Sequence, residues 1–133
     1  MVMKKVMLIL LTSLLLLVGG RYLFSLFTPK TKIEANNAKI IYIFNDHNIN
    51  QLLSNNESKI IKDILNNKKL YSDNPSCGFS ENISICFDNL VFCLACDNCA
   101  IIKFGDKFFK ISETDREKIN KIIENYGGSF PCL

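Results

Sequence analysis

The chain has 133 residues, of which 48% are hydrophobic, 22% are charged and six are cysteines, and its formal net charge is +3. Four of the basic residues, Lys4, Lys5, Arg21 and Lys30, lie in or beside an apolar N-terminal segment. The rest of the chain has 12 basic and 13 acidic residues, a net charge of −1. A nearly neutral remainder lacks an electrostatic footprint for nucleic acid, and its length leaves room for one small domain.

Residues 1–27 are predicted to form an N-terminal hydrophobic helix that acts as a signal peptide or signal-anchor. Lys4 and Lys5 precede an unbroken apolar run, which is how export and membrane-insertion signals begin. Cleavage near Gly20, at a small-residue site, is one version. In the other version the apolar character resumes after Arg21, and residues 6–27 cross the membrane while Arg21 extends its head towards water. We favour the uncleaved anchor.

Membrane orientation decides whether the cysteines meet an oxidising or a reducing compartment. Lys4 and Lys5 favour a cytoplasmic N-terminus, whereas Arg21, Lys30 and Lys32 favour the opposite orientation. The basic-then-apolar order is typical of a signal that delivers the rest of its chain across the membrane. We therefore expect a single-pass protein of the cell membrane with its C-terminal domain outside the cytoplasm, or a secreted protein if the leader is cleaved. The abundance of Asn, Ile and Lys favours an AT-rich, bacterial genome.

The segment after the leader predicts a tether and then the start of the folded domain. Residues 28–37 are polar and contain Pro29, so we expect them to lift the domain, residues 38–133, off the membrane. Residues 39–44, KIIYIF, are β-branched and aromatic and predict a buried strand. The next residues, NDHNIN, are rich in breakers and predict the end of that strand.

A capped helix and a loop are predicted next. Ser54 and Glu57 have the spacing of a capping box, in which each side chain satisfies a free backbone N–H of the other. Isoleucines and a leucine then form one apolar face, and the helix should fade at residues 66–69. Residues 71–82 concentrate turn-forming residues around Pro75 and predict a loop.

Two β-hairpins are predicted in the middle of the domain. The first turns at Asp88 and Asn89, which sets Ser84 opposite Cys93. One face of this hairpin then belongs to the core and carries Ile83, Ile85, Phe87, Leu90 and Phe92. The other face carries two of the cysteines, in the set Ser84, Cys86, Val91 and Cys93. The second hairpin, residues 100–111, turns at Gly105, which can take the positive φ of a tight turn.

The last predicted element is a helix that begins after Ser112 or Thr114 and ends at Gly127 or Gly128. Its apolar residues recur at helical spacing: Ile119, Ile122, Ile123 and Tyr126. The order β-α-β-β-β-β-α, preceded by the hydrophobic helix, predicts an α+β fold with a small, mainly antiparallel sheet and two amphipathic helices on one face.

The cysteines form an even set that lies entirely in the domain: Cys77, Cys86, Cys93, Cys96, Cys99 and Cys132. In a small exported domain such a set indicates disulfides, although the pairing does not follow from sequence alone. A Cys86–Cys93 bond is disfavoured, because diagonal neighbours in a hairpin have about 7–8 Å between their Cα atoms. Cys132 is expected to pin the C-terminal tail to Cys77 or to a cysteine of residues 93–99.

The C-x-x-C-x-x-C spacing over residues 93–99 leaves two other chemistries open. A zinc site would combine Cys93, Cys96 and Cys99 with Cys77, Cys86 or Cys132, whereas zinc usually takes two separated C-x-x-C pairs. A thiol–disulfide enzyme needs a cysteine with a depressed pKa, and Asp97 should raise the pKa of its neighbours.

Other catalytic patterns are missing from the sequence. It holds no Gly-rich phosphate loop, no Ser-centred elbow and no H-E-x-x-H, and its single histidine, His47, is interpreted as a turn residue. We therefore expect an exported, disulfide-stabilised binding or inhibitor module without a cofactor, anchored through residues 6–27 and facing a protein partner at the cell surface. A membrane-associated thiol-redox or zinc-binding protein is the alternative.

Overall fold

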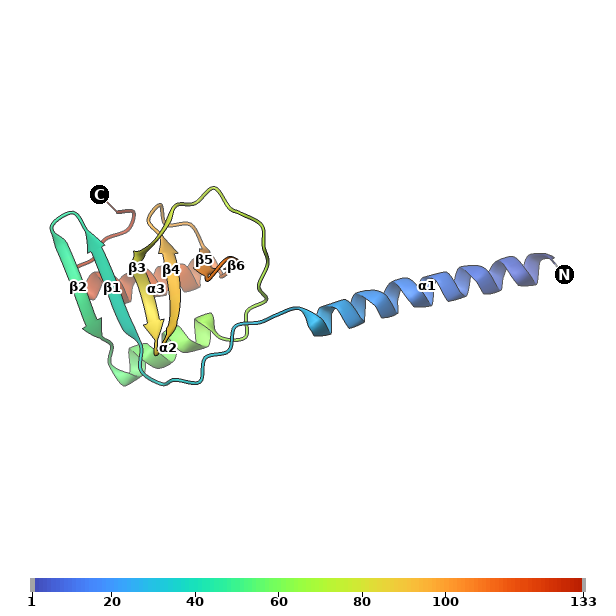
Figure 1. Cartoon of the computed structure of the whole chain (residues 1–133), viewed down its shortest axis with the longest axis horizontal. Coiled ribbons are helices and arrows are strands. Elements are labelled where there is room, and N and C mark those ends of the chain that lie inside the picture. Colours follow the sequence, from blue (N-terminus) through green and yellow to red (C-terminus); the bar gives the residue numbers. More distant parts are fainter. Residues whose placement is uncertain (1, 133) are drawn as a thin grey trace.

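The computed structural model of the chain describes residues 2–132. The strands form a six-stranded antiparallel sheet. Figure 1 shows helices packed against this sheet and a long N-terminal helix that projects away from it. The elements in chain order are α1 (Val2–Phe27), β1 (Lys39–Phe44), β2 (His47–Leu52), α2 (Asn55–Leu65), β3 (Phe79–Phe87), β4 (Leu90–Ala95), β5 (Ile101–Phe104), β6 (Lys107–Lys110) and α3 (Glu113–Asn125). The strands are arranged β2-β1-β3-β4-β5-β6, and the predicted α+β class is confirmed.

Helix α1 makes little contact with the rest of the fold. Its segment Met3–Phe24 is long and apolar enough to cross a membrane or to serve as a signal sequence, and none of it is buried. The hydroxyls of Thr12 and Ser13 donate to carbonyl oxygens one turn back, so the helix satisfies these polar groups internally. Such internal satisfaction is what a lipid environment requires.

Within residues 28–38, of which 28–37 are expected to form a tether, several side chains pack against the domain. Thr31 and Ile33 are 3% exposed and Ala38 is fully buried. The hydroxyl of Thr31 donates to the carbonyl oxygen of Leu65 at 2.7 Å, and the N–H of Ala38 donates to the hydroxyl of Ser58 at 3.0 Å. Lys32, Glu34, Asn36 and Asn37 stay exposed, so the segment is held to α2 and the chain just after it by its buried residues and their hydrogen bonds.

The structure adds one strand that the sequence pattern does not reveal. Residues expected to end β1 turn at Asn45, which has a φ of +50°, and return as β2, so that His47 lies in a strand and pairs with Phe44. Ile49 is the single buried side chain of β2. A polar edge strand of this kind lacks the apolar alternation that identifies strands in a sequence.

The register predicted for both central hairpins is confirmed. Phe87 pairs with Leu90 about a turn in which Asp88 has a φ of +50°, and Phe104 pairs with Lys107 about Gly105, at a φ of +61°. The alternate residues of these strands that face α2 and α3 form the core: Ile83, Ile85, Phe87, Phe92, Leu94, Ile102 and Phe109. The opposite, helix-free face carries the cysteines of β3 and β4.

Both predicted helix caps form, and one of them links the two helices. Ser54 and Glu57 make the reciprocal capping box at the start of α2, and Ser112 caps α3. The hydroxyl of Tyr126, at the end of α3, donates to Oε2 of Glu57 at 2.8 Å. The hydrogen bond from Ser54, followed by that from Tyr126, holds the pKa of the Glu57 carboxyl below its usual value.

Glu57 makes the stability of the domain sensitive to acid. Its carboxylate is the stabilising form, so its contribution is complete above the pKa of about 4.3 expected in the unfolded chain and is lost as the pH falls through the lower folded value. We expect Glu57→Gln to cost roughly 0.3–1 kcal/mol at pH 7 and to lose less stability than the wild type between neutral and acidic pH. Urea denaturation at pH 7 and at low pH measures both effects, and parallel losses in the two proteins would contradict the assignment.

Candidate functional site

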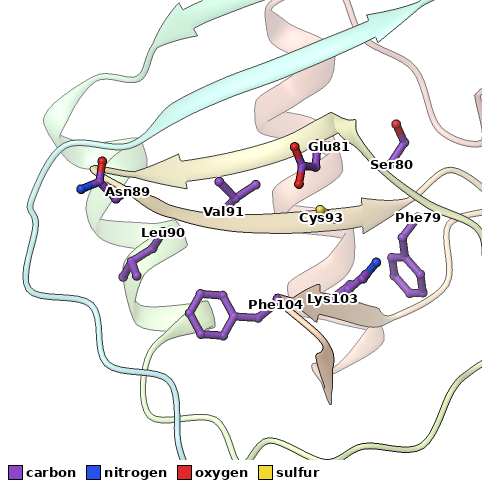
Figure 2. Close-up of a pocket in the computed structure, with 10 residues that line it drawn as sticks. Phe79, Ser80, Glu81, Asn89, Leu90, Val91, Cys93, Lys103 and Phe104 are labelled. Carbon is purple, nitrogen blue, oxygen red and sulfur yellow. The ribbon is translucent and has the colours of Figure 1, made fainter.

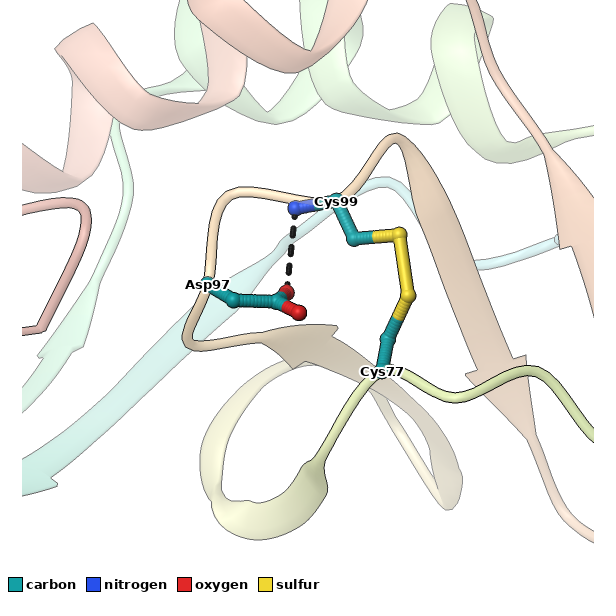
Figure 3. Close-up of side chains that lie close together, drawn as sticks. All are labelled: Cys77, Asp97 and Cys99. Carbon is teal, nitrogen blue, oxygen red and sulfur yellow. Dashed lines mark hydrogen bonds between the residues drawn. A yellow bond between two sulfur atoms is a disulfide. The ribbon is translucent and has the colours of Figure 1, made fainter.

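Four of the six cysteines are joined in two disulfides that meet at the connection between β4 and β5. Cys96 is bonded to Cys132 in the C-terminal tail, with 5.2 Å between the two Cα atoms. Cys99 is bonded to Cys77 in the loop before β3, with 6.5 Å between the Cα atoms (Figure 3). One short connection therefore ties together the sheet, the tail and the long loop between α2 and β3.

The C-x-x-C-x-x-C spacing does not gather its three sulfur atoms at one point. Cys93 lies within β4, on the helix-free face, whereas Cys96 and Cys99 come after the end of that strand and bond to different segments. Cys86 and Cys93 are free thiols, because pairing Ser84 with Cys93 leaves these two cysteines diagonal to each other. The structure thus contains two disulfides and two thiols in place of six bonded cysteines.

Arg116 of α3 lies beneath this connection and holds it by its carbonyl oxygens. The side chain is 1% exposed. One guanidinium nitrogen donates to the carbonyl oxygen of Ala95 at 2.6 Å and another to that of Cys99 at 2.9 Å, while Nε donates to Oδ1 of Asn120 at 2.8 Å. Burial lowers the pKa of Arg116 to about 10, and Asp97 opposes the shift.

Two further contacts extend the support around Arg116. The amide of Asn120 donates to Oδ1 of Asn98, whose φ is +66° in the cysteine connection. The guanidinium also lies over the ring of Phe130, 4.8 Å from its centroid, just before the tail cysteine. A buried cation that is solvated by backbone carbonyls and an aromatic face in this way is a structural clamp on the disulfide region.

The described part of the chain holds one group of potential metal ligands. The sulfur atoms of Cys77 and Cys99 and a carboxylate oxygen of Asp97 all lie within 4.8 Å of one another. The two sulfurs are joined as a disulfide, and Asp97 accepts a hydrogen bond from the N–H of Cys99 at 3.2 Å, as Figure 3 shows. A cysteine binds zinc as a thiolate, and a zinc site usually has four ligands, so these two cysteines could serve a metal only after reduction.

The free thiol of Cys93 is poorly suited to nucleophilic chemistry. Its side chain is 7% exposed. Burial, followed by the charge of Glu81, raises the pKa of this thiol above its usual value. The thiolate is the reactive form of cysteine, so a raised pKa and low exposure make Cys93 a weak nucleophile.

Cys93 forms part of the floor of a groove on the helix-free face (Figure 2). The groove has a volume of about 370 Å³ and is lined by Phe79, Glu81, Val91 and Lys103 among others. A register shift lies beside it: Phe79 and Ser84, which pair with Ala95 and Cys93, are five positions apart in β3, whereas their partners are two apart in β4. The hydroxyl of Ser84 donates to the carbonyl oxygen of Glu81 at 2.7 Å and stabilises the displaced segment.

Neither a family model, nor a curated protein, nor a solved structure matches this chain.

Sequence reasoning missed Arg116 and the groove, for different reasons. Arg116 lies three residues before Ile119, which places it on the buried stripe of α3. A charged residue at that spacing could have been recognised as a buried side chain that needs hydrogen-bond partners. The groove brings together residues of β3, β4 and β5 beside the register shift in β3, which no local pattern of residues 79–84 reveals.

Proposed function

We propose that the protein is a membrane-anchored, extracytoplasmic module that binds a protein partner at the cell surface, and that it is not an enzyme. The observation that carries the proposal is the combination of two disulfides with an N-terminal apolar helix that no other part of the described fold covers. Disulfides persist in oxidising compartments, and an exposed apolar helix of this length suits a bilayer.

The groove on the helix-free face is the proposed binding surface. It combines the aromatic ring of Phe79 with opposite charges at Glu81 and Lys103, which suits a polypeptide with both apolar and charged side chains. Cys93 contributes a neutral thiol to its floor. The single histidine, His47, is exposed on the edge strand β2, and β1 and β3 separate β2 from β4, so it does not activate that thiol.

Topology and thiol content test the compartment. A reporter fused after Leu133 should be active only outside the cytoplasm, and titration of the unfolded, unreduced chain should detect two thiols, from Cys86 and Cys93. Six reactive thiols with bound zinc would instead establish the alternative, a zinc protein, and a reporter active in the cytoplasm would overturn the proposed location.

Photo-crosslinking on intact cells tests the binding surface. A photoreactive amino acid at Ser80, an exposed residue of the groove, should yield an adduct with a cell-surface protein. The matched control is the same amino acid at Lys121, an exposed residue on the opposite, helix-covered side. Failure to form an adduct at Ser80, or adducts of equal yield at both positions, would contradict the assignment of the groove.

A further inference from the structure

Two lysines are held opposite each other where α1 meets the domain. Residues 29–31 pair with residues 67–70: the N–H of Leu70 donates to the carbonyl oxygen of Pro29 at 2.9 Å, and Lys30 bridges Lys69 in antiparallel fashion. Like charges directly opposite in an antiparallel pair are destabilising. This cost would be relieved by an anion at the same place.

Arg21 adds a third cation on the same side. Leu16, Leu17, Gly20 and Phe24 of α1 line a hollow of about 630 Å³ together with Arg21 and Lys69. The hollow therefore combines apolar side chains with two cations. That combination matches a molecule with an acyl chain and an anionic group.

No carboxylate in the described chain is positioned to neutralise these cations by an ion pair. The ion pairs found among residues 2–132 join Lys32 to Glu34 and Lys118 to Asp115. The sequence contains no Asp or Glu before Glu34, and none between residues 64 and 72. The positive charge at this junction is therefore available to an external anion.

Aromatic residues indicate the depth at which the hollow would lie. Tyr22 is exposed near the C-terminal end of α1, next to the exposed rings of Phe24 and Phe27, and tyrosine concentrates at the membrane–water interface. Residues 6–20 span about 22 Å as a helix, and the extended side chains of Lys5 and Arg21 at its two ends reach the faces of a hydrocarbon core of about 30 Å. Arg21 and Lys69 then lie at the level of the lipid phosphates.

We propose that Arg21 and Lys69, with Lys30 beside them, form a binding site for an anionic phospholipid. The phosphate and the net negative headgroup contact the three cations, and one acyl chain lies along Leu16, Leu17 and Gly20 on the membrane side of Arg21. Because residues 29–38 are packed against the domain, a bound lipid holds the whole domain against the membrane in one orientation. The inference rests on the proposed function, since it requires the uncleaved anchor.

Native mass spectrometry of the full chain in a neutral detergent tests the site. The protein is titrated with phosphatidylglycerol and, separately, with phosphatidylcholine, and the bound lipid is counted. We expect the wild type to prefer phosphatidylglycerol. Each basic residue near an anionic lipid surface contributes a factor of about five to the affinity. In the double variant Arg21→Gln and Lys69→Gln, the preference for phosphatidylglycerol over phosphatidylcholine should therefore fall by roughly 25-fold. Inorganic phosphate in excess should not displace the lipid.

The control variant removes the same charge elsewhere, through Lys59→Gln and Lys121→Gln on exposed positions of α2 and α3. It should bind phosphatidylglycerol as the wild type does. Equal binding of both lipids by the wild type, equal loss in the two double variants, or displacement by inorganic phosphate would each overturn the site. The same spectra report the mass of the chain: a mass beginning after Gly20 would overturn the anchor itself, whereas a full-length mass without headgroup preference overturns only the lipid site.

Discussion

Replacing both Cys96 and Cys132 with serine is expected to lower the free energy of unfolding by about 2–4 kcal/mol. This bond closes a sequence separation of 36 residues, against 22 for Cys77–Cys99, so its entropic effect on the unfolded chain is larger by about 0.4 kcal/mol. It also anchors the tail that places Phe130 over Arg116 and against Tyr42. Urea denaturation under oxidising conditions measures the loss.

The free cysteines provide the matched control for this experiment. Cys86→Ser changes a half-buried thiol that takes part in no disulfide, and it should leave the free energy of unfolding within about 0.5 kcal/mol of the wild type. The variant that replaces both Cys77 and Cys99 with serine should have a free energy of unfolding between that of Cys86→Ser and that of the variant without Cys96 and Cys132. If Cys86→Ser were as destabilising as either double variant, the pairing of the cysteines would have to be revised.

Substitution of Arg116 is expected to lower the free energy of unfolding by a large amount. Comparing a methionine and a lysine variant distinguishes the effect of the buried charge from that of the hydrogen bonds. Arg116→Met leaves the carbonyl oxygens of Ala95 and Cys99 without their guanidinium donors, and each such group costs about 1–3 kcal/mol. Removal of a buried charge partly offsets this loss, because the lowered pKa shows that burial disfavours the charged form. We expect a net loss of at least about 2 kcal/mol.

Arg116→Lys should be less stable than Arg116→Met. A lysine retains the buried charge, but its single ammonium group does not reproduce the planar guanidinium that reaches both carbonyls and Asn120. Equilibrium unfolding of the three proteins gives the order, and the rate at which a reductant opens each disulfide reports the local effect on residues 95–99. Lys121→Met, on the exposed side of α3, is the control. An Arg116→Lys variant as stable as the wild type would contradict the clamp.

Local sequence signals predicted most of the secondary structure because each reflects an interaction within a few residues. The turns at Asp88 and Gly105, the capping box of Ser54 and Glu57, and the stripe after Ser112 depend on backbone conformation and neighbouring side chains. The strand β2 escaped prediction because its stability comes from pairing with β1, and a polar edge strand buries little apolar surface of its own.

The candidate site was predicted less completely, because its parts come together only through long-range contacts. Cysteine spacing alone suggested a common site for Cys93, Cys96 and Cys99. Strand alternation directs Cys93 to the helix-free face. Cys96 and Cys99 lie after the end of β4 and bond to two different segments, the C-terminal tail and the loop before β3. The sequence of residues 28–37, expected to form a tether, likewise did not reveal the contacts at Thr31 and Ala38, because these hydrogen bonds reach residues twenty or more positions away, Ser58 among them.

The sequence by itself determined the apolar N-terminal helix, the α+β class, the registers of both central hairpins and the exclusion of a Cys86–Cys93 bond, because these result from composition, periodicity and tight-turn geometry. Only the tertiary structure decided which cysteines pair, that a buried Arg116 holds their connection, and that the chain after α1 is packed on the domain. Those outcomes depend on which distant segments share the limited surface of one small core, and no local pattern specifies that.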